Sequence, residues 1–153
     1  LKEVYPAVRS ICDLTVAGFR PNERVKQSCQ ESGVKLVNSP DKMEPYFRET
    51  ELVLAPIFGG GGMKVKIAEA LSYGLPVMTT DHGNIGYNLI DRKNGFIANT
   101  AQDFISEIKF YYGLDNEART LILKNSWETY VEKFSLNAAT KRCDEIIRYL
   151  TAK

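Results

Sequence analysis

The sequence contains few of the residues that cross-link a fold or bind transition metals. It has three cysteines, one histidine and no Cys-x-x-Cys pair in 153 residues, so it offers no set of zinc ligands. Scattered cysteines in an odd number also argue against a disulfide framework and favour a reducing compartment such as the cytoplasm. Cys143 shares one apolar helical face with Ile146 and Leu150, and we expect it to pack in the core.

Strong charge of one sign and long hydrophobic runs are also missing. The 20 Lys and Arg residues nearly balance the 19 Asp and Glu residues, which leaves a net charge of +1. Nothing in this balance attracts a nucleic acid, and we expect no such partner. The longest apolar segments, such as Leu52 to Phe58, are much shorter than the ~20 residues that span a bilayer. The length fits one domain of ordinary size.

Short apolar strands alternate with amphipathic helices along most of the chain. The expected strands are Leu14–Phe19, Lys35–Asn38, Leu52–Ile57, Leu75–Thr80 and Gly95–Ala98. The expected helices are Glu23–Ser32, ended by Gly33, a short helix opened by Ser39 to Asp41, Met63–Tyr73, Ala101–Tyr112, and a last helical stretch from Asn116 in which Ser135 is a cap. This alternation predicts right-handed βαβ units. The fold class is therefore α/β, a Rossmann-like doubly wound parallel sheet.

The N-terminal segment precedes any strand. Leu1 to Ile11 suggests a helix interrupted by Pro6. A βαβ domain that begins on a helix is expected to have its first strand upstream. We therefore expect this chain to be part of a longer protein.

A run of four glycines, Gly59 to Gly62, lies between a predicted strand and the next predicted helix. Ligands of parallel α/β sheets bind outside the carboxyl ends of the strands. Glycines let the backbone approach a ligand closely, and the amides and dipole of a helix N-terminus favour an anion. Lys64 and Lys66 add two positive charges nearby. The segment predicts a phosphate or diphosphate site, with a plain surface loop as the alternative.

The glycine run matches neither of two common phosphate-binding motifs. A P-loop requires Gly-Lys followed by Ser or Thr, but Met63 separates Gly62 from Lys64 here, and Val65 follows. A dinucleotide fingerprint requires a third glycine where this sequence has Lys64. The ligand class is therefore left open by these two motifs.

Two further titratable residues lie near this run. Glu69 falls in the second turn of the predicted helix, where a carboxylate can accept hydrogen bonds from vicinal hydroxyls such as those of ribose. An exposed ion pair with Lys66 is the alternative. His82 follows the fourth predicted strand and is either a contact in the cleft or an ordinary loop residue.

The segment LVLAPIFGGGGMKVKIAEALSYGLPVMTT, residues 52–80, resembles the nucleotide-sugar-binding signature of GT-B glycosyltransferases. More narrowly, it is similar to the C-terminal domain of the retaining group 1 family. That family has a strand ending in proline, a glycine-rich loop, Lys-x-x-Glu-Ala, and a helix ending in Gly-x-Pro-Val. The matching elements are Pro56, the glycine run, Lys66 to Ala70 and Gly74 to Val77. The segments Val16–Pro21, Lys35–Thr50, Gly95–Ile97 and Phe134-Ser135 extend the resemblance over nearly the whole chain.

The resemblance implies roles for the glycine loop and the helix behind it. Glu69 would match the second glutamate of a paired-glutamate motif and hold the ribose hydroxyls of a nucleotide-sugar donor. The amides of Gly61, Gly62 and Met63 would cradle the donor sugar or its diphosphate. Gly61 stands where the family has the first glutamate of the pair, so that glutamate's contacts to the sugar cannot be made by a side chain. Some family members carry this glycine-and-lysine form of the loop.

The resemblance also implies roles for four other residues. Lys64 and Lys66 would neutralise phosphate charge. Asn38 and Ser39, at the end of a predicted strand, would edge the pocket for the base. The resemblance assigns no catalytic residue within this chain.

Other expected parts of the site lie outside the chain. In the family, an Arg and a Lys that bind the diphosphate follow the domain's first strand, which we expect upstream of Leu1. Arg20 and Lys26 are therefore expected to be solvated surface residues. The acceptor pocket of GT-B enzymes belongs to an N-terminal domain that residues 1–153 do not include. We expect residues 1–153 to form the single donor-binding domain, to bind donor weakly and to transfer nothing alone.

The resemblance thus implies a hexosyltransferase that moves a sugar from a nucleoside-diphosphate sugar to a glycan or lipid-linked acceptor, without a metal or another cofactor. Polysaccharide or lipid-linked glycan synthesis is the expected pathway. The expected location is the cytoplasm, with the full-length enzyme in peripheral contact with the inner face of the membrane. Two alternatives stay open: half of a nucleotide-sugar 2-epimerase, and a non-catalytic module that binds nucleotide sugars.

Overall fold

The chain alternates strands and helices, as its sequence pattern predicts. The computed structural model describes residues 1–152. The strands are β1 (Thr15–Gly18), β2 (Lys35–Asn38), β3 (Val53–Ala55), β4 (Val77–Thr79) and β5 (Phe96–Ile97). The helices are α1 (Tyr5–Val8), α2 (Glu23–Ser32), α3 (Glu44–Arg48), α4 (Val65–Ser72), α5 (Asp81–Asn84), α6 (Ala101–Gly113), α7 (Asn116–Lys133) and α8 (Leu136–Thr151). The α/β class is confirmed, and α5 is a short helix that the sequence did not reveal.

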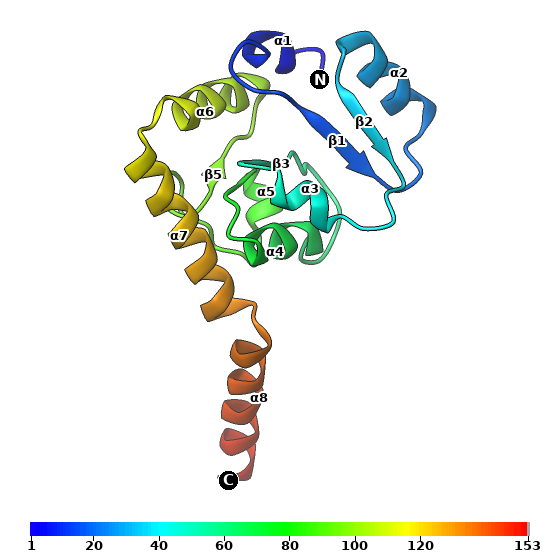
Figure 1. Cartoon of the computed structure of the whole chain (residues 1–153). Coiled ribbons are helices and arrows are strands. Elements are labelled where there is room, and N and C mark those ends of the chain that lie inside the picture. The colour runs from blue at the N-terminus through cyan, green and yellow to red at the C-terminus, as the bar shows by residue number, and fades with distance from the viewer. Residues whose placement is uncertain (153) are drawn as a thin grey trace.

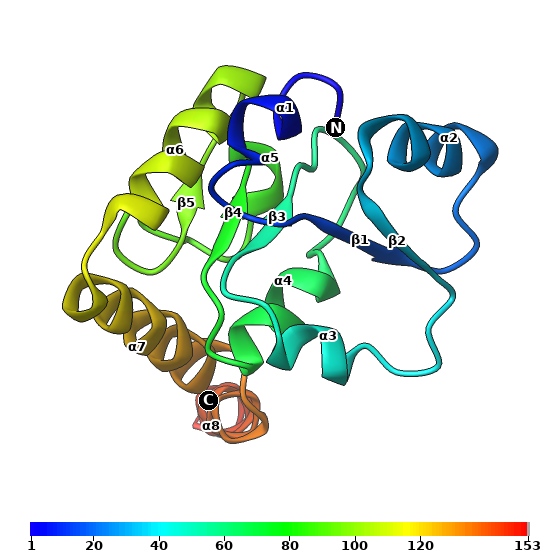
Figure 2. The same cartoon turned by 45° about the horizontal axis from the view of Figure 1, so that its top comes forward.

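All strand pairs are parallel, but the strands form two sheets. One sheet has the order β1-β2 and the other has the order β3-β4-β5. Thr15 pairs with Lys35 in the first sheet, and Val53 pairs with Val77 in the second. Within residues 1–152, no backbone pairing joins β1 to β3. Figure 2 shows the strands in the order β5, β4, β3, β1 and β2 across the view.

The three-stranded sheet is covered on both faces by separate apolar clusters. One cluster packs α4 against the sheet and includes Ile67, Leu71 and Val77. The other includes Met78 and Ile108, and so packs α6 against the opposite face. Val77 and Met78 are neighbours in β4, and side chains alternate between the faces of a strand. The central strand β4 is therefore fully buried, as expected for a parallel sheet between helix layers.

Local sequence signals determine several helix ends. Gly33 ends α2 with a φ of 66°, a left-handed conformation that glycine adopts readily. Ser135 caps α8, because its side chain accepts a hydrogen bond from the amide of Ala138 at 3.2 Å. Both of these predictions are confirmed.

Two predicted helices near the N-terminus differ in length from the expectation. Pro6 does not interrupt α1 but lies in its first turn, where the missing amide proton of proline costs no helical hydrogen bond. The short helix α3 begins at Glu44 and not at Ser39. The residue Ser39 instead adopts a left-handed conformation with a φ of 52°, which is incompatible with an α-helical turn.

Helix α8 extends away from the body of the molecule (Figure 1). Ile146 is 58% exposed, Leu150 is 65% exposed, and Cys143 is also exposed. The prediction that Cys143 packs in the core is therefore wrong. The apolar periodicity correctly marks one face of a helix, but no element within residues 1–152 covers that face. Among the helices of this described part, none combines the length and apolar character needed to cross a bilayer.

Candidate functional site

The loop between β3 and α4 is exposed and depends on glycine for its shape. Gly60 and Gly62 have φ angles of 94° and 70°, which side-chain-bearing residues rarely adopt. The amides of Gly61, Gly62 and Met63 find no hydrogen-bond acceptor within residues 1–152. The side chain of Lys64, at the N-cap of α4, caps none of the helix amides. The loop thus offers several unpaired N–H groups beside the positive end of a helix dipole.

Lys64 turns back onto the loop that precedes it. Its Nζ donates hydrogen bonds to the carbonyl oxygens of Gly60 at 2.9 Å and Gly61 at 2.8 Å. In a planar trans peptide, the C=O and the following N–H point in opposite directions. The two contacts therefore turn the amides of Gly61 and Gly62 away from the Lys64 ammonium. The role of Lys64 on a donor phosphate stays a prediction.

The end of β4 and the start of α5 hold the segment that leads into the loop. Side chains from these elements bind backbone carbonyl oxygens of the segment after β3. The pairs are Thr79 Oγ1 with Ala55 O at 2.8 Å, Thr80 Oγ1 with Ile57 O, and His82 Nε2 with Gly60 O at 2.8 Å. The position of the glycine loop is therefore tied to the central strand of the sheet.

The far end of the loop is held by residues after α5. The Tyr87 hydroxyl donates a hydrogen bond to the carbonyl of Lys64 at 2.7 Å. Burial raises the pKa of Tyr87, so the phenol stays a neutral donor at physiological pH. The side chain of Met63 lies against Gly86, where an added Cβ would come within 2.9 Å of the Met63 Cγ. The loop is thus anchored at its start by His82 and at its end by Tyr87.

Lys66 and Glu69 are both exposed on α4. Within residues 1–152 they form no ion pair with each other, and the Glu69 carboxylate makes no hydrogen bond. The alternative interpretation, a surface ion pair, is therefore not seen in the structure. The carboxylate of Glu69 is accessible to a ligand beside the loop.

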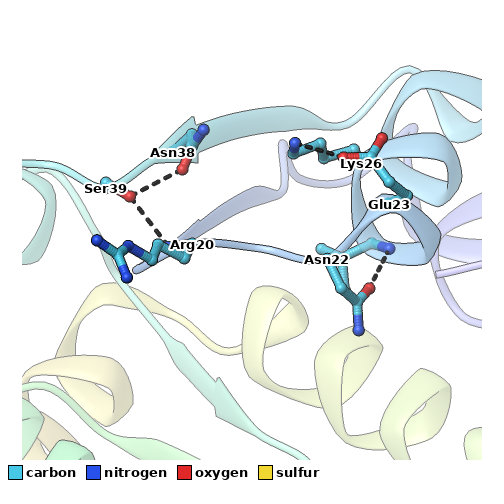
Figure 3. A network of polar contacts seen from close by, with 7 residues as sticks. Arg20, Asn22, Glu23, Lys26, Asn38 and Ser39 are labelled. Atoms are coloured by element: carbon cyan, nitrogen blue, oxygen red, sulfur yellow. Dashed lines mark hydrogen bonds and ion pairs between the residues drawn. The ribbon is translucent and has the colours of Figure 1, made fainter.

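A second group of polar residues lies at the carboxyl ends of β1 and β2 (Figure 3). The Arg20 amide donates to the Ser39 hydroxyl at 3.0 Å, and that hydroxyl donates to Asn38 Oδ1 at 2.9 Å. The Ser39 amide donates to the carbonyl of Gly18 at 2.8 Å. Arg20 and Ser39 both have positive φ angles, 47° and 52°. Such conformations cost about 1–2 kcal/mol for a side-chain-bearing residue and here are stabilised by this cross-strand network.

Asn38 and Ser39 line a surface hollow of about 580 Å³ together with Asp41, Lys42 and Tyr46. The structure therefore brings together the two residues expected to edge a base pocket. No hydrogen bond or ion pair within residues 1–152 connects this group to the glycine loop. The two halves of the predicted site thus belong to different sheets.

Arg20 and Lys26 occupy surface positions near the second group (Figure 3). The Arg20 guanidinium is 4.9 Å from the centre of the Phe19 ring. The Lys26 ammonium pairs with Glu23 at 2.6 Å, and the Lys26 side chain is 42% exposed. Neither group enters the glycine loop, which agrees with the expectation that both are solvated surface residues.

Sequence reasoning missed Thr79, Thr80 and Tyr87 as residues that support the loop. Thr79 ends a buried strand and Thr80 follows it, and hydroxyl groups at such positions are a usable signal because a buried hydroxyl needs a partner. Tyr87 gives no comparable signal. Its partner lies 23 residues away, so only the tertiary structure reveals the contact.

Comparisons with known proteins show similarity to one family. The family model described as "Glycosyl transferases group 1" matches residues 1–112. No curated protein matches the chain. At 15% identity and a TM-score of 0.76, the Anabaena protein HepE in complex with UDP-glucose aligns with 97% of this chain and 44% of its own. Sucrose-phosphate synthase from Thermosynechococcus elongatus aligns at 16% identity and a TM-score of 0.76, and the alignment covers 99% of this chain and 42% of that one.

A third similar structure is itself a single domain. The C-terminal domain of a glycosyl transferase group 1 family protein, LpcC from Francisella tularensis, aligns at 16% identity and a TM-score of 0.60. The alignment covers 74% of this chain and 62% of that one. These structural likenesses establish the fold. The chain spans less than half the length of the HepE and sucrose-phosphate synthase structures.

Proposed function

The chain belongs to the group 1 glycosyl transferases, and we propose that it supplies the part of such an enzyme that binds a nucleoside-diphosphate sugar. Its fold is that of a C-terminal GT-B domain, so the resemblance noted in the sequence is confirmed. Glycosyl transfer is the activity of this family. The donor-site role of this chain is the proposal developed below.

The observation that carries the proposal is the set of unpaired amides in the glycine loop. Gly61, Gly62 and Met63 present N–H groups that have no acceptor within residues 1–152. They precede the N-terminus of α4, whose dipole favours an anion. A diphosphate supplies the oxygen atoms that such groups bind. The complex of HepE with UDP-glucose supports this ligand class by analogy.

Residues around the loop would bind the rest of the donor. The exposed Glu69 carboxylate can accept two hydrogen bonds from ribose hydroxyls. Lys66 and Lys64 would add positive charge beside the phosphates. Asn38 and Ser39, which line the hollow at the end of β2, would contact the base.

The proposed chemistry is transfer of the sugar with the nucleoside diphosphate as leaving group. The bond between the anomeric carbon and the diphosphate oxygen breaks, the oxygen of an acceptor hydroxyl forms the new bond to that carbon, and the hydroxyl proton passes to the leaving diphosphate. Negative charge develops on the leaving diphosphate, where fixed amides and a helix dipole stabilise it. In this proposal no metal or other cofactor takes part, and the acceptor is a glycan or lipid-linked sugar bound by a further domain of a longer protein.

A non-catalytic module that binds nucleotide sugars is the second candidate. Gly61 favours it, because this position lacks the carboxylate that the family places near the donor sugar. A module of this kind would bind the nucleotide sugar but would show no transfer in the full-length protein, even with acceptors present.

Titration of the protein with UDP, UDP-glucose and inorganic diphosphate tests the proposal. We expect binding that shifts the amide resonances of Gly61, Gly62 and Met63 in nuclear magnetic resonance (NMR) spectra. The Glu69→Gln variant should weaken UDP binding and leave diphosphate binding unchanged. Absence of any shift in these three amides at millimolar ligand would overturn the donor-site role.

A further inference from the structure

His82 lies beside the glycine loop, between residues that form hydrogen bonds of their own. It lies in α5, where the Thr80 hydroxyl accepts a hydrogen bond from the Gly83 amide at 3.0 Å. The Asp81 amide donates to Asn99 Oδ1 at 2.9 Å, and the Asn99 side-chain amide donates to Asp81 Oδ2 at 2.8 Å. Asp81 is therefore bound to the segment after β5, and Gly83 to the N-cap residue of its own helix.

Packing beneath α5 leaves no room for a side chain at Gly83. A Cβ added at Gly83 would lie 2.1 Å from the Thr79 hydroxyl oxygen and 3.4 Å from the Ile57 Cβ. Glycine thus lets α5 sit directly on the ends of β3 and β4. The His82 ring is consequently presented to the loop from a helix that packs on the end of β4 and on Ile57.

The contact between His82 and Gly60 has a defined donor. The Nε2 atom lies 2.8 Å from the Gly60 carbonyl oxygen, and a carbonyl oxygen only accepts hydrogen bonds. Nε2 therefore carries the proton, which requires the Nε2–H tautomer when the ring is neutral. A second donor, Lys64 Nζ, binds the same oxygen at 2.9 Å, so both lone pairs of this carbonyl are used.

The two donors on the Gly60 carbonyl differ in what supports them. Lys64 is only four residues from Gly60, at the start of α4, and has a long flexible side chain. Its ammonium is also the cation nearest to the loop amides in sequence, so an entering diphosphate would attract it away from the carbonyls. His82, by contrast, comes from α5 and is not part of the loop. It would hold the Gly60 carbonyl while the ammonium moves.

We propose that His82 is a positioning residue that fixes the peptide between Gly60 and Gly61, so that the Gly61 amide faces the donor diphosphate when Lys64 leaves the loop. The inference rests on the proposed function, because it assigns the loop a diphosphate ligand. His82 does not touch the reacting atoms. It acts through the orientation of one peptide group.

The His82→Phe and His82→Gln variants test this inference in the same UDP titration. Phenylalanine fills similar space without a donor, whereas the glutamine side-chain amide retains one. We expect His82→Phe to weaken UDP binding about fivefold, the effect of losing one neutral hydrogen bond. His82→Gln should restore most of the affinity. Equal affinity of His82→Phe and the unaltered protein would overturn the inference while leaving the proposed function intact.

A spectroscopic measurement covers the case in which His82→Phe fails to fold. His82 is the single histidine of the sequence, so its ring nitrogens give unambiguous ¹⁵N NMR signals. We expect the Nε2–H tautomer under conditions where the ring is neutral. The Nδ1–H tautomer would overturn the inference whether or not UDP binds. Failure of the unaltered protein to bind UDP or diphosphate would instead overturn the proposed function.

Discussion

The hydroxyl group of Tyr87 donates a hydrogen bond to the backbone carbonyl of Lys64 at 2.7 Å. This contact joins Tyr87, a residue that is 1% exposed, to the N-cap residue of the helix behind the glycine loop. Removing the hydroxyl alone should therefore loosen that helix start without opening a cavity. We expect Tyr87→Phe to lower the free energy of unfolding by about 1 kcal/mol, as measured by urea denaturation. An unchanged denaturation midpoint would contradict the importance of this contact.

A matched pair of glycine substitutions tests the packing of α5. Gly83→Ala places a methyl group 2.1 Å from the Thr79 hydroxyl oxygen, and we expect a loss of about 1–3 kcal/mol in unfolding free energy. Gly113 ends α6, and an added Cβ there meets nothing within 4 Å. Gly113→Ala should be neutral or stabilise the protein by up to about 1 kcal/mol. Thermal unfolding of both variants gives the comparison, and equal effects would show that α5 shifts freely.

Glu69→Gln tests the ribose contact without changing the size of the side chain. Two charge-assisted hydrogen bonds would be weakened, so UDP affinity should fall by about tenfold to a hundredfold. Stability should change by no more than about 0.5 kcal/mol, because Glu69 is exposed and its carboxylate makes no hydrogen bond or ion pair within residues 1–152. Calorimetric titration measures the affinity, and Glu128→Gln on α7 is a control at another exposed carboxylate. Equal UDP affinity in both variants would exclude the ribose role.

Alkaline pH should destabilise the protein through its buried and partly buried tyrosines. Burial raises the pKa of Tyr112 from 10.0 to about 12, and burial also raises the pKa of Tyr87 and Tyr111. Above pH 10 the unfolded chain loses phenolic protons that the folded chain keeps, so the unfolded state binds fewer protons and stability falls as pH rises. The decline should run between about pH 10 and pH 12. Tyr112→Phe should reduce this decline of the unfolding free energy with pH, as measured by urea denaturation at a series of pH values. An equal decline in Tyr112→Phe and the unaltered protein would contradict the role of Tyr112.

The parts of the fold that depend on local chemistry could be predicted from the sequence. All five strands, the end of α2 at Gly33 and the cap at Ser135 follow from apolar periodicity, a left-handed glycine and a hydroxyl cap. The glycine loop after β3 was also predicted, because its four glycines lie between a predicted strand and a predicted helix. What the sequence could not show is the division of the strands into two sheets, because periodicity carries no information on which strands pair.

The parts of the candidate site that depend on tertiary contacts could not be predicted. The sequence did not indicate that the Lys64 ammonium would bind the carbonyls of its own loop, and its role on a phosphate stays a prediction. His82 was open to two interpretations, and its contact with Gly60, 22 residues away, could not be seen in the sequence. The apolar face of α8 was predicted only in part. Its periodicity identified a face correctly, but periodicity alone cannot identify what covers it.

The hydroxyl group of Thr80 serves two elements with one oxygen atom. Its single proton is directed to the carbonyl of Ile57, and its lone pair receives the amide proton of Gly83. The hydroxyl cannot rotate to improve one contact without losing the other. Detaching the chain after β3 would therefore leave the hydroxyl that caps the helix carrying His82 without its own acceptor, which couples the two segments energetically.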